Sequence, residues 1–239
     1  MNVAIVFAGG VGRRMNNSAI PKQFLILQGK PIIIHTLEVF EHSPDIDSIC
    51  IACHKDYLDY LRRLCGKFSI SKVHWIVPGG ATGQESIFNG LQAVHQDCGD
   101  DTVVLIHDGV RPNITAELIA DNVRSVLAHG SAISCAQATE TPAEADENGQ
   151  ITVISERKRA VIAKAPQSFF LGDIYNAHQQ ARSQGRDDFI DSASMMRHYG
   201  HTLYMVPCPW DNIKITTPSD FYIFRAILEA RENSRIFGI

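Results

Sequence analysis

The residues best suited to chemistry begin with a glycine-rich loop after the first apolar run of the chain. The loop reads Ala8-Gly9-Gly10-Val11-Gly12-Arg13-Arg14-Met15. Glycine lets backbone N–H groups approach an anion closely, and an arginine adds a charged, bidentate clamp. A P-loop would need Gly-Lys-Ser/Thr, and Met15 stands where a dinucleotide-binding loop has its third glycine. The loop therefore predicts a polyphosphate site, with a tight turn that needs glycine for positive φ as the alternative.

A lysine returns to the same region soon after this loop. In Pro21-Lys22-Gln23-Phe24-Leu25, the spacing would let Lys22 fold over the same phosphates. Surface lysines are usually just solvated, but the preceding proline restricts the position of this one. Arg14 and Lys22 together would neutralise much of a triphosphate.

Two aspartates follow extended runs farther along the chain. Val103-Val104-Leu105-Ile106 leads into His107-Asp108-Gly109-Val110-Arg111-Pro112, and Asp211 precedes Asn212-Ile213-Lys214. A carboxylate at the end of a central strand can hold Mg²⁺ against a nucleotide. The alternative for Asp108 is the cap of a turn, and His107 is interpreted as structural.

The elements that must position these residues alternate between strand and helix. Strand-like runs occupy 2–7, 48–53, 73–77, 102–107 and 132–136. Between them, apolar residues recur with helical spacing at Ile87, Leu91 and Val94, and at Ile119, Val123, Val126 and Leu127. This alternation predicts an α/β, Rossmann-like three-layer fold with a mainly parallel sheet. Ligands of such sheets bind beyond the carboxyl ends of the strands.

Two further segments have signals of their own. Thr217, Pro218 and Asp220 are typical of the start of a helix. Residues 138–160 are mostly polar and contain the turn signal Asn148-Gly149 between short extended runs. They predict a projecting β-hairpin arm, either a surface excursion or a dimerisation device.

Composition excludes several classes of protein. A net charge of −4 argues against broad nucleic-acid binding, which needs many cations facing phosphates. No apolar run approaches the ~20 residues of a membrane span, and no signal peptide is evident, so we expect a cytoplasmic protein without a membrane. The six cysteines suggest buried free thiols, and the pair Cys50 and Cys53 should point to opposite faces of a strand rather than bind zinc.

The motifs AGGxGxRM, PKQFL, HDGVRP, APQSFF and DNIKITTP occur here in one order along nearly the whole chain. In these motifs and their order, the chain resembles the sugar-alcohol-phosphate cytidylyltransferases. These comprise the methylerythritol-phosphate enzymes of isoprenoid synthesis and the ribitol-5-phosphate enzymes that make CDP-ribitol. The resemblance implies one nucleotidyltransferase domain over 1–239 that transfers CMP from CTP to a polyol phosphate with Mg²⁺ as cofactor. It also implies a homodimer formed through the arm.

The resemblance implies roles for individual residues. Catalytic positions would be Arg14, Lys22 and Lys214. Nucleotide-binding positions would be Ala8, Gly9, Gly10, Gly12, Gly80, Ser86 and Asp108. Substrate-binding positions would be Arg111, Thr141 and Arg157, with Arg157 reaching the partner's site, and Asp108 and Asp211 would lie beside the metal.

Three positions depart from the family pattern and bear on specificity. Gly83 stands where the isoprenoid enzymes commonly carry arginine, and Ala165 and Ile190 replace two threonines near the polyol. The passages 31–36 and 111–115 favour the ribitol branch, and the methylerythritol branch is the alternative. A sugar-1-phosphate nucleotidyltransferase and a non-catalytic nucleotide-binding module also stay open.

Overall fold

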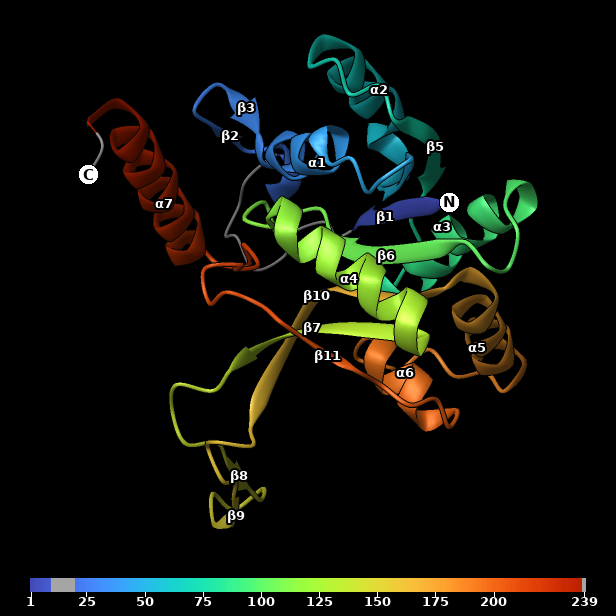
Figure 1. Ribbon diagram of the computed structural model, residues 1–239, viewed down its shortest axis with the longest axis vertical. Coiled ribbons are helices and arrows are strands. Elements are labelled where there is room, and N and C mark those ends of the chain that lie inside the picture. The colour runs from blue at the N-terminus through green and yellow to red at the C-terminus, as the bar shows by residue number, and fades with distance from the viewer. Residues whose placement is uncertain (10–19, 238–239) are drawn as a thin grey trace.

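A computed structural model of the chain describes residues 1–9 and 20–237, and its centre is a seven-stranded sheet (Figure 1). The strand order is β11-β7-β10-β6-β1-β4-β5. These strands are β1 (Asn2–Ala8), β4 (Ser48–Cys53), β5 (Val73–Pro78), β6 (Val103–Asp108), β7 (Ser131–Gln137), β10 (Val161–Phe170) and β11 (Met205–Pro207). The helices are α1 (Ile32–His42), α2 (Leu58–Lys67), α3 (Gly83–Asp97), α4 (Ala116–His129), α5 (Leu171–Ser183), α6 (Ser192–His198) and α7 (Pro218–Phe237).

The mainly parallel sheet expected from the sequence is confirmed. β1 pairs in parallel with β4 and β6, β4 with β5, and β7 with β11. β10 is the exception among these strands, because it runs antiparallel to both β6 and β7. The cause is local: the chain leaves β7, forms the arm and turns directly back into β10.

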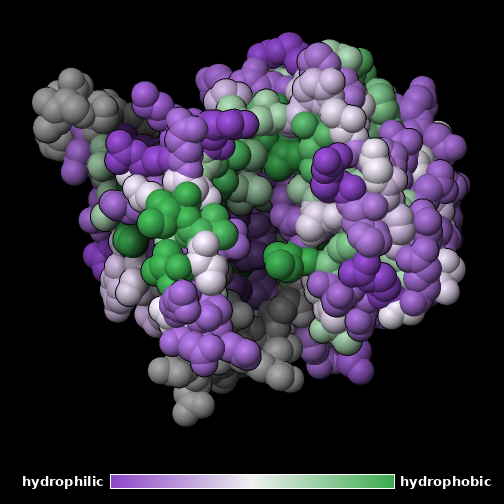
Figure 2. Space-filling view, turned by 90° about the horizontal axis from the view of Figure 1, so that it is seen from below, coloured by the Kyte–Doolittle hydropathy of each residue, from purple (hydrophilic) through white to green (hydrophobic). Residues whose placement is uncertain are grey.

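The arm projects from the ends of β7 and β10, away from the sheet (Figure 1). Its tip is a two-stranded hairpin of β8 (Ala143–Ala145) and β9 (Ile151–Ile154). Asp146 starts the turn by accepting from the backbone N–H groups of Asn148 and Gln150, and Gly149 takes a φ of 82°. A β-hairpin arm was expected here and is confirmed. Viewed from the side of the arm, hydrophobic side chains gather in patches around a hollow (Figure 2).

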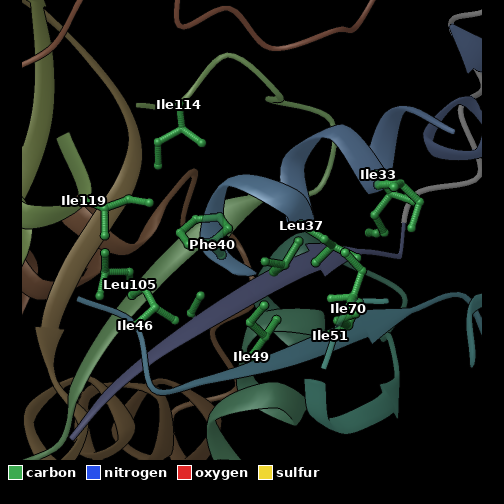
Figure 3. Close-up of a cluster of buried hydrophobic side chains, with 14 of the residues drawn as sticks. Ile33, Leu37, Phe40, Ile46, Ile49, Ile51, Ile70, Leu105, Ile114 and Ile119 are labelled. Atoms are coloured by element: carbon green, nitrogen blue, oxygen red, sulfur yellow. The ribbon is translucent and has the colours of Figure 1, made fainter. Parts of the chain in front are cut away.

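Helices cover both faces of the sheet, which gives three layers. α1, α2 and α4 bury their apolar sides in one hydrophobic cluster, part of which is drawn in Figure 3. α3, α5 and α6 bury theirs in a second cluster. Strand residues alternate between the two clusters as the pleat requires. Cys50 therefore lies in one cluster and Cys53 in the other, and both are free thiols.

The ends of the helices follow from their capping residues. Thr82 and Thr115 accept from the backbone N–H groups of Glu85 and Leu118 and so begin α3 and α4. α4 ends at Gly130, which adopts a φ of 81°. The helical spacing of Ile119, Val123, Val126 and Leu127 predicts one buried face, and this was wrong for Leu127, which is exposed. Leu127 lies about 100° around the helix from Val126, beyond the side that meets the sheet.

α7 begins at Pro218, as the sequence predicted. Thr217 and Asp220 bond each other's backbone N–H groups, which completes the capping pattern. Phe224 is buried in a small third cluster that also contains Leu27 and Ile32.

The smallest elements are β2 (Ile26–Leu27), β3 (Lys30–Pro31) and two single-turn helices at Lys22–Phe24 and Lys55–Tyr57. No helix within the described ranges is long and apolar enough to cross a membrane.

Candidate active site

Two adjoining cavities lie where β1 and β6 end and α3 begins. The larger has a volume of about 350 Å³ and the smaller about 200 Å³. The residues that line both cavities are Phe7, Thr82, Gly83, Asp108 and Lys214. The cavities therefore form one cleft at the strand edge where an α/β fold binds its ligands.

Asp108, Arg111 and Lys214 form an ionic group at the junction of the two cavities. Lys214 Nζ lies 2.6 Å from Asp108 Oδ1, and Arg111 Nε lies 3.2 Å from Asp108 Oδ2. Burial alone would raise the pKa of Asp108, but the Lys214 ammonium and the Arg111 guanidinium outweigh it and hold that pKa below its usual value. The carboxylate is thus ionised and holds two cations in place.

Lys22 lines the smaller cavity, so the structure brings it to the same cleft as Lys214. Its ammonium donates to the carbonyl oxygen of Ile215 at 2.9 Å, the residue that follows Lys214. Gly10, Gly12 and Arg14 lie outside the described residues. Their roles at this cleft stay predictions.

Gly9, Gly80 and Ser86 meet at the wall of the smaller cavity. A Cβ atom on Gly9 would come within 2.7 Å of Ser86 Oγ, so a larger residue here would push the Ser86 hydroxyl aside. Ser86 Oγ accepts from the backbone N–H of Gly80 at 3.0 Å and donates to the Thr82 carbonyl at 2.9 Å. Ala8 lines the same cavity. The start of α3 lies here too, and helix N-termini favour anions.

The larger cavity holds several of the residues predicted to bind substrate or to depart from the family pattern. Arg111, Gly83, Ala165 and Ile190 all line it. Ile190 is 96% exposed, and no atom lies within 4 Å of a Cβ built on Gly83. The wall near Ala165 and Ile190 thus presents methyl and alkyl groups where hydroxyls were expected.

Asp211 is placed differently from Asp108. It lines neither of these two cavities, and its carboxylate lies 3.6 Å from Arg231 of α7. Across the described residues, no group of three or more His, Cys, Asp and Glu side chains could hold a metal ion. Mg²⁺ commonly needs only one or two carboxylates plus substrate phosphates. Asp108 fits that requirement, and the metal role of Asp211 stays a prediction.

Thr141 and Arg157 lie on the arm and line neither cavity of their own chain. Both residues are exposed. The carbonyl of Arg157 accepts from Gln137 Nε2 at 2.7 Å, which anchors the base of the arm. Their predicted contact with substrate would have to come from the arm of another copy.

His107 is buried one residue before Asp108 and lines neither cavity. Its Nε2 lies 2.9 Å from the Arg111 carbonyl, and its ring packs edge-on against Phe40. Burial lowers the pKa of His107 to about 4. The imidazole is therefore neutral near pH 7 and supports the turn that presents Arg111.

Sequence reasoning missed Lys164 and Gln167, which both line the larger cavity. Gln167 Nε2 donates to Asp191 Oδ2 at 2.8 Å, and Lys164 Nζ donates to the Trp210 carbonyl at 2.8 Å. A signal was present, because Lys164 stands between Ala163 and Ala165 in a run that is otherwise apolar from Val161. Charged residues within strand-like runs are rarely buried without a partner.

Known proteins resemble the chain along nearly its whole length. The family model described as 2-C-methyl-D-erythritol 4-phosphate cytidylyltransferase (IspD) matches residues 2–230. Proteins called ribitol-5-phosphate cytidylyltransferase are similar over their whole lengths: one from Streptococcus agalactiae is 49% identical over 239 residues, with 100% of each chain covered. Another from Vibrio parahaemolyticus is 50% identical over 238 residues, again with 100% of each covered.

A solved structure shares the fold. The 4-diphosphocytidyl-2C-methyl-D-erythritol synthase of Anaerococcus prevotii superposes with a TM-score of 0.81, covering 95% of this chain and 96% of that one. Its sequence identity is 24%, so this likeness concerns the fold alone.

Proposed function

The chain belongs to the IspD family of cytidylyltransferases, and we propose that it transfers CMP from CTP to ribitol 5-phosphate. The products would be CDP-ribitol and pyrophosphate. The observation that carries the choice of polyol is the 49–50% identity, over full length, to two proteins named for ribitol 5-phosphate. The geometry supports the same reaction, because two adjoining cavities can hold a nucleotide and a second phosphate side by side.

The reaction needs little covalent help from the protein. A phosphate oxygen of ribitol 5-phosphate attacks the α-phosphorus of CTP and forms the new P–O bond. The bond from that phosphorus to the oxygen bridging to the β-phosphate breaks, and pyrophosphate leaves with the electron pair. The second pKa of a phosphomonoester is about 6, so the attacking group is already largely dianionic near pH 7. No general base is required, in keeping with a neutral, buried His107.

The protein's contribution is position and charge. Lys22 lines the smaller cavity, where the triphosphate would lie beside the glycines at 9 and 80. Lys214 lines both cavities, so its ammonium can contact groups on either side of the reacting phosphorus. Arg111 lines the larger cavity, where it would bind the polyol phosphate. Fixed cations of this kind stabilise the charge that develops in phosphoryl transfer.

Mg²⁺ is the cofactor we propose, with Asp108 as the residue that would hold it. Bound to the triphosphate, the ion would supply neutralising charge. Both Asp108 oxygens already contact cations, so the carboxylate would exchange or share one of these partners. Chelation should therefore abolish turnover, and added Mg²⁺ should restore it.

We further propose a homodimer built through the arm, residues 138–160. Aliphatic side chains are exposed on the arm and where it enters β10, at Ile151, Val153, Ile154, Val161 and Ile162. A cluster of exposed aliphatic residues typically marks an interaction surface. Thr141 and Arg157 would then reach the cleft of the partner subunit.

One assay tests the reaction and the substrate together. The protein is incubated with CTP, Mg²⁺ and either ribitol 5-phosphate or 2-C-methyl-D-erythritol 4-phosphate, and the CDP-linked product is identified by mass. We expect CDP-ribitol and pyrophosphate in equal amounts. A faster reaction with the methylerythritol substrate would reassign the branch. Turnover with UTP and a sugar 1-phosphate, or none with any pair, would overturn the proposal.

A further inference from the structure

Lys164, on β10, is a buried cation without a role in the function proposed above. Its side chain is 8% exposed and lines the larger cavity. Its ammonium donates to the backbone carbonyls of Trp210 at 2.8 Å and Asn212 at 3.3 Å. It also lies 4.6 Å from the centre of the Trp210 ring, within the range of a cation–π contact.

These contacts bind Lys164 to the segment that carries Lys214. The Asn212 carbonyl that accepts from Lys164 also accepts from Arg111 Nη1 at 2.7 Å. The Asn212 side chain returns a bond, since its Nδ2 donates to the carbonyl of Ala165 at 2.8 Å. Hydrogen bonds therefore run from β10 to residues 210 and 212, and from residue 212 back to β10.

The far side of Lys214 is fixed in a similar way. The backbone N–H of Ile215 donates to the Val110 carbonyl at 2.8 Å, and the Ile215 carbonyl accepts from Lys22. Lys214 is therefore held between an anchor at Asn212 and another at Ile215. The Asp211 carbonyl also accepts from Asn113 Nδ2 at 2.7 Å, so loss of the Lys164 bonds would loosen this side of the segment rather than release it.

The chemistry of Lys164 argues for such a role. Burying an ammonium group costs free energy, and bonds to neutral carbonyls offset only part of that cost. Burial accordingly lowers the pKa of Lys164. An apolar side chain of similar length would fill this place in β10 without that cost. The bonds of the ammonium to residues 210 and 212 therefore need a functional explanation.

We propose that Lys164 is a positioning residue, which fixes residues 210–212 so that Lys214 stays against Asp108 and the reacting phosphates. The inference rests on the cytidylyltransferase function proposed above and deepens it. Lys164 acts through Lys214 and Arg111, and not by donating or accepting a proton.

The test is Lys164→Met, which keeps the length of the side chain and removes the ammonium. Its matched control is Lys72→Met, because Lys72 Nζ also donates to a backbone carbonyl, that of Ser43 at 2.7 Å, outside the cleft. We expect Lys164→Met to lower kcat at least tenfold, as displaced catalytic groups do, with KM for CTP changed less than threefold. Lys72→Met should keep the wild-type kcat, and Lys164→Arg, which keeps the charge and the donors, should recover part of the loss.

Two further measurements separate positioning from mere stability. Thermal unfolding of both methionine variants shows whether any loss of rate follows a loss of folded protein. A crystal structure of Lys164→Met should show residues 210–214 displaced and the contact between Lys214 and Asp108 lengthened. Wild-type kcat in Lys164→Met, equal losses in both variants, or an unmoved segment would each overturn the inference. The wild-type rate with CTP and ribitol 5-phosphate, measured alongside, tests the proposed function separately.

Discussion

The ammonium of Lys214 and the carboxylate of Asp108 lie 2.6 Å apart, although more than a hundred residues separate them in sequence. Asp108 ends the central strand β6, whereas Lys214 belongs to the irregular segment that leads to α7. The pair stands where the two cavities meet. A cation held there by a buried acid is ordered before substrate binds, which reduces the entropy lost on reaching the transition state.

Lys214→Met should lower kcat by about 10²-fold, the usual cost of removing one group that stabilises transition-state charge. Lys30→Met provides the control, because Lys30 also forms an ion pair at 2.6 Å, with Glu38, but lines neither cavity. Steady-state assays of pyrophosphate release give both values. An unchanged kcat in Lys214→Met would remove this residue from the mechanism.

Gly9→Ala should weaken CTP binding at least tenfold. The new Cβ would meet Ser86 Oγ at 2.7 Å and displace the hydroxyl that accepts from the Gly80 N–H. Titration calorimetry with CTP measures the effect. Gly66→Ala is the control, since nothing lies within 4 Å of its Cβ and Gly66 lies within α2. Alanine there should leave binding intact and stabilise the fold by about 0.5–1 kcal/mol. CTP affinity equal in the two variants would contradict the close approach at Gly9.

Much of the fold could be predicted because its signals are local. The strand at 48–53 is apolar throughout and is buried along its whole length. Thr217, Pro218 and Asp220 fixed the start of α7 through contacts within four residues. The direction of β10 could not be predicted in this way. It depends on the arm returning the chain beside β7, and no periodicity within 161–170 encodes that direction.

The candidate site was partly predictable for the same reason. Asp108 ends β6 and Gly9 follows β1, so the topology alone brings them to one edge of the sheet. The contacts of Lys164 could not be predicted, because its partners are backbone carbonyls at 210 and 212, which have no sequence signature. The surroundings of Asp211 depend on where α7 packs, since Arg231 belongs to that helix. Such contacts between distant segments require coordinates.

Acid should destabilise the protein through His178, whose burial lowers its pKa from 6.5 to about 4. The His178 imidazole binds its proton more tightly in the unfolded chain than in the folded one. The stability that depends on neutral His178 is therefore fully present above about pH 6.5 and is lost as the pH falls toward 4. At pH 5 the loss is about 2 kcal/mol. Urea unfolding at pH 7 and pH 5 should show this loss in the wild type and a smaller one in His178→Leu.

The control for this prediction is His74→Gln. His74 is exposed, so its replacement removes no buried side chain. This variant should keep the wild-type dependence of unfolding free energy on pH. An identical dependence in His178→Leu and the wild type would show that His178 is protonated equally in both states. The buried His107 should contribute to the remaining slope, since its pKa is also lowered to about 4.

Mixing two inactive variants tests whether the arm acts on a partner's site. Arg157→Ala and Lys214→Met should each be nearly inactive alone. If Arg157 serves the partner's cleft, a mixed dimer contains one site with both residues intact. Unfolding and refolding the variants together in equal amounts should then restore about a quarter of the wild-type sites, because half of the dimers are mixed and each has one intact site. Size-exclusion chromatography with light scattering would establish the dimer. If a mixture shown to contain mixed dimers recovers no activity, Arg157 acts at the cleft of its own subunit, or at none.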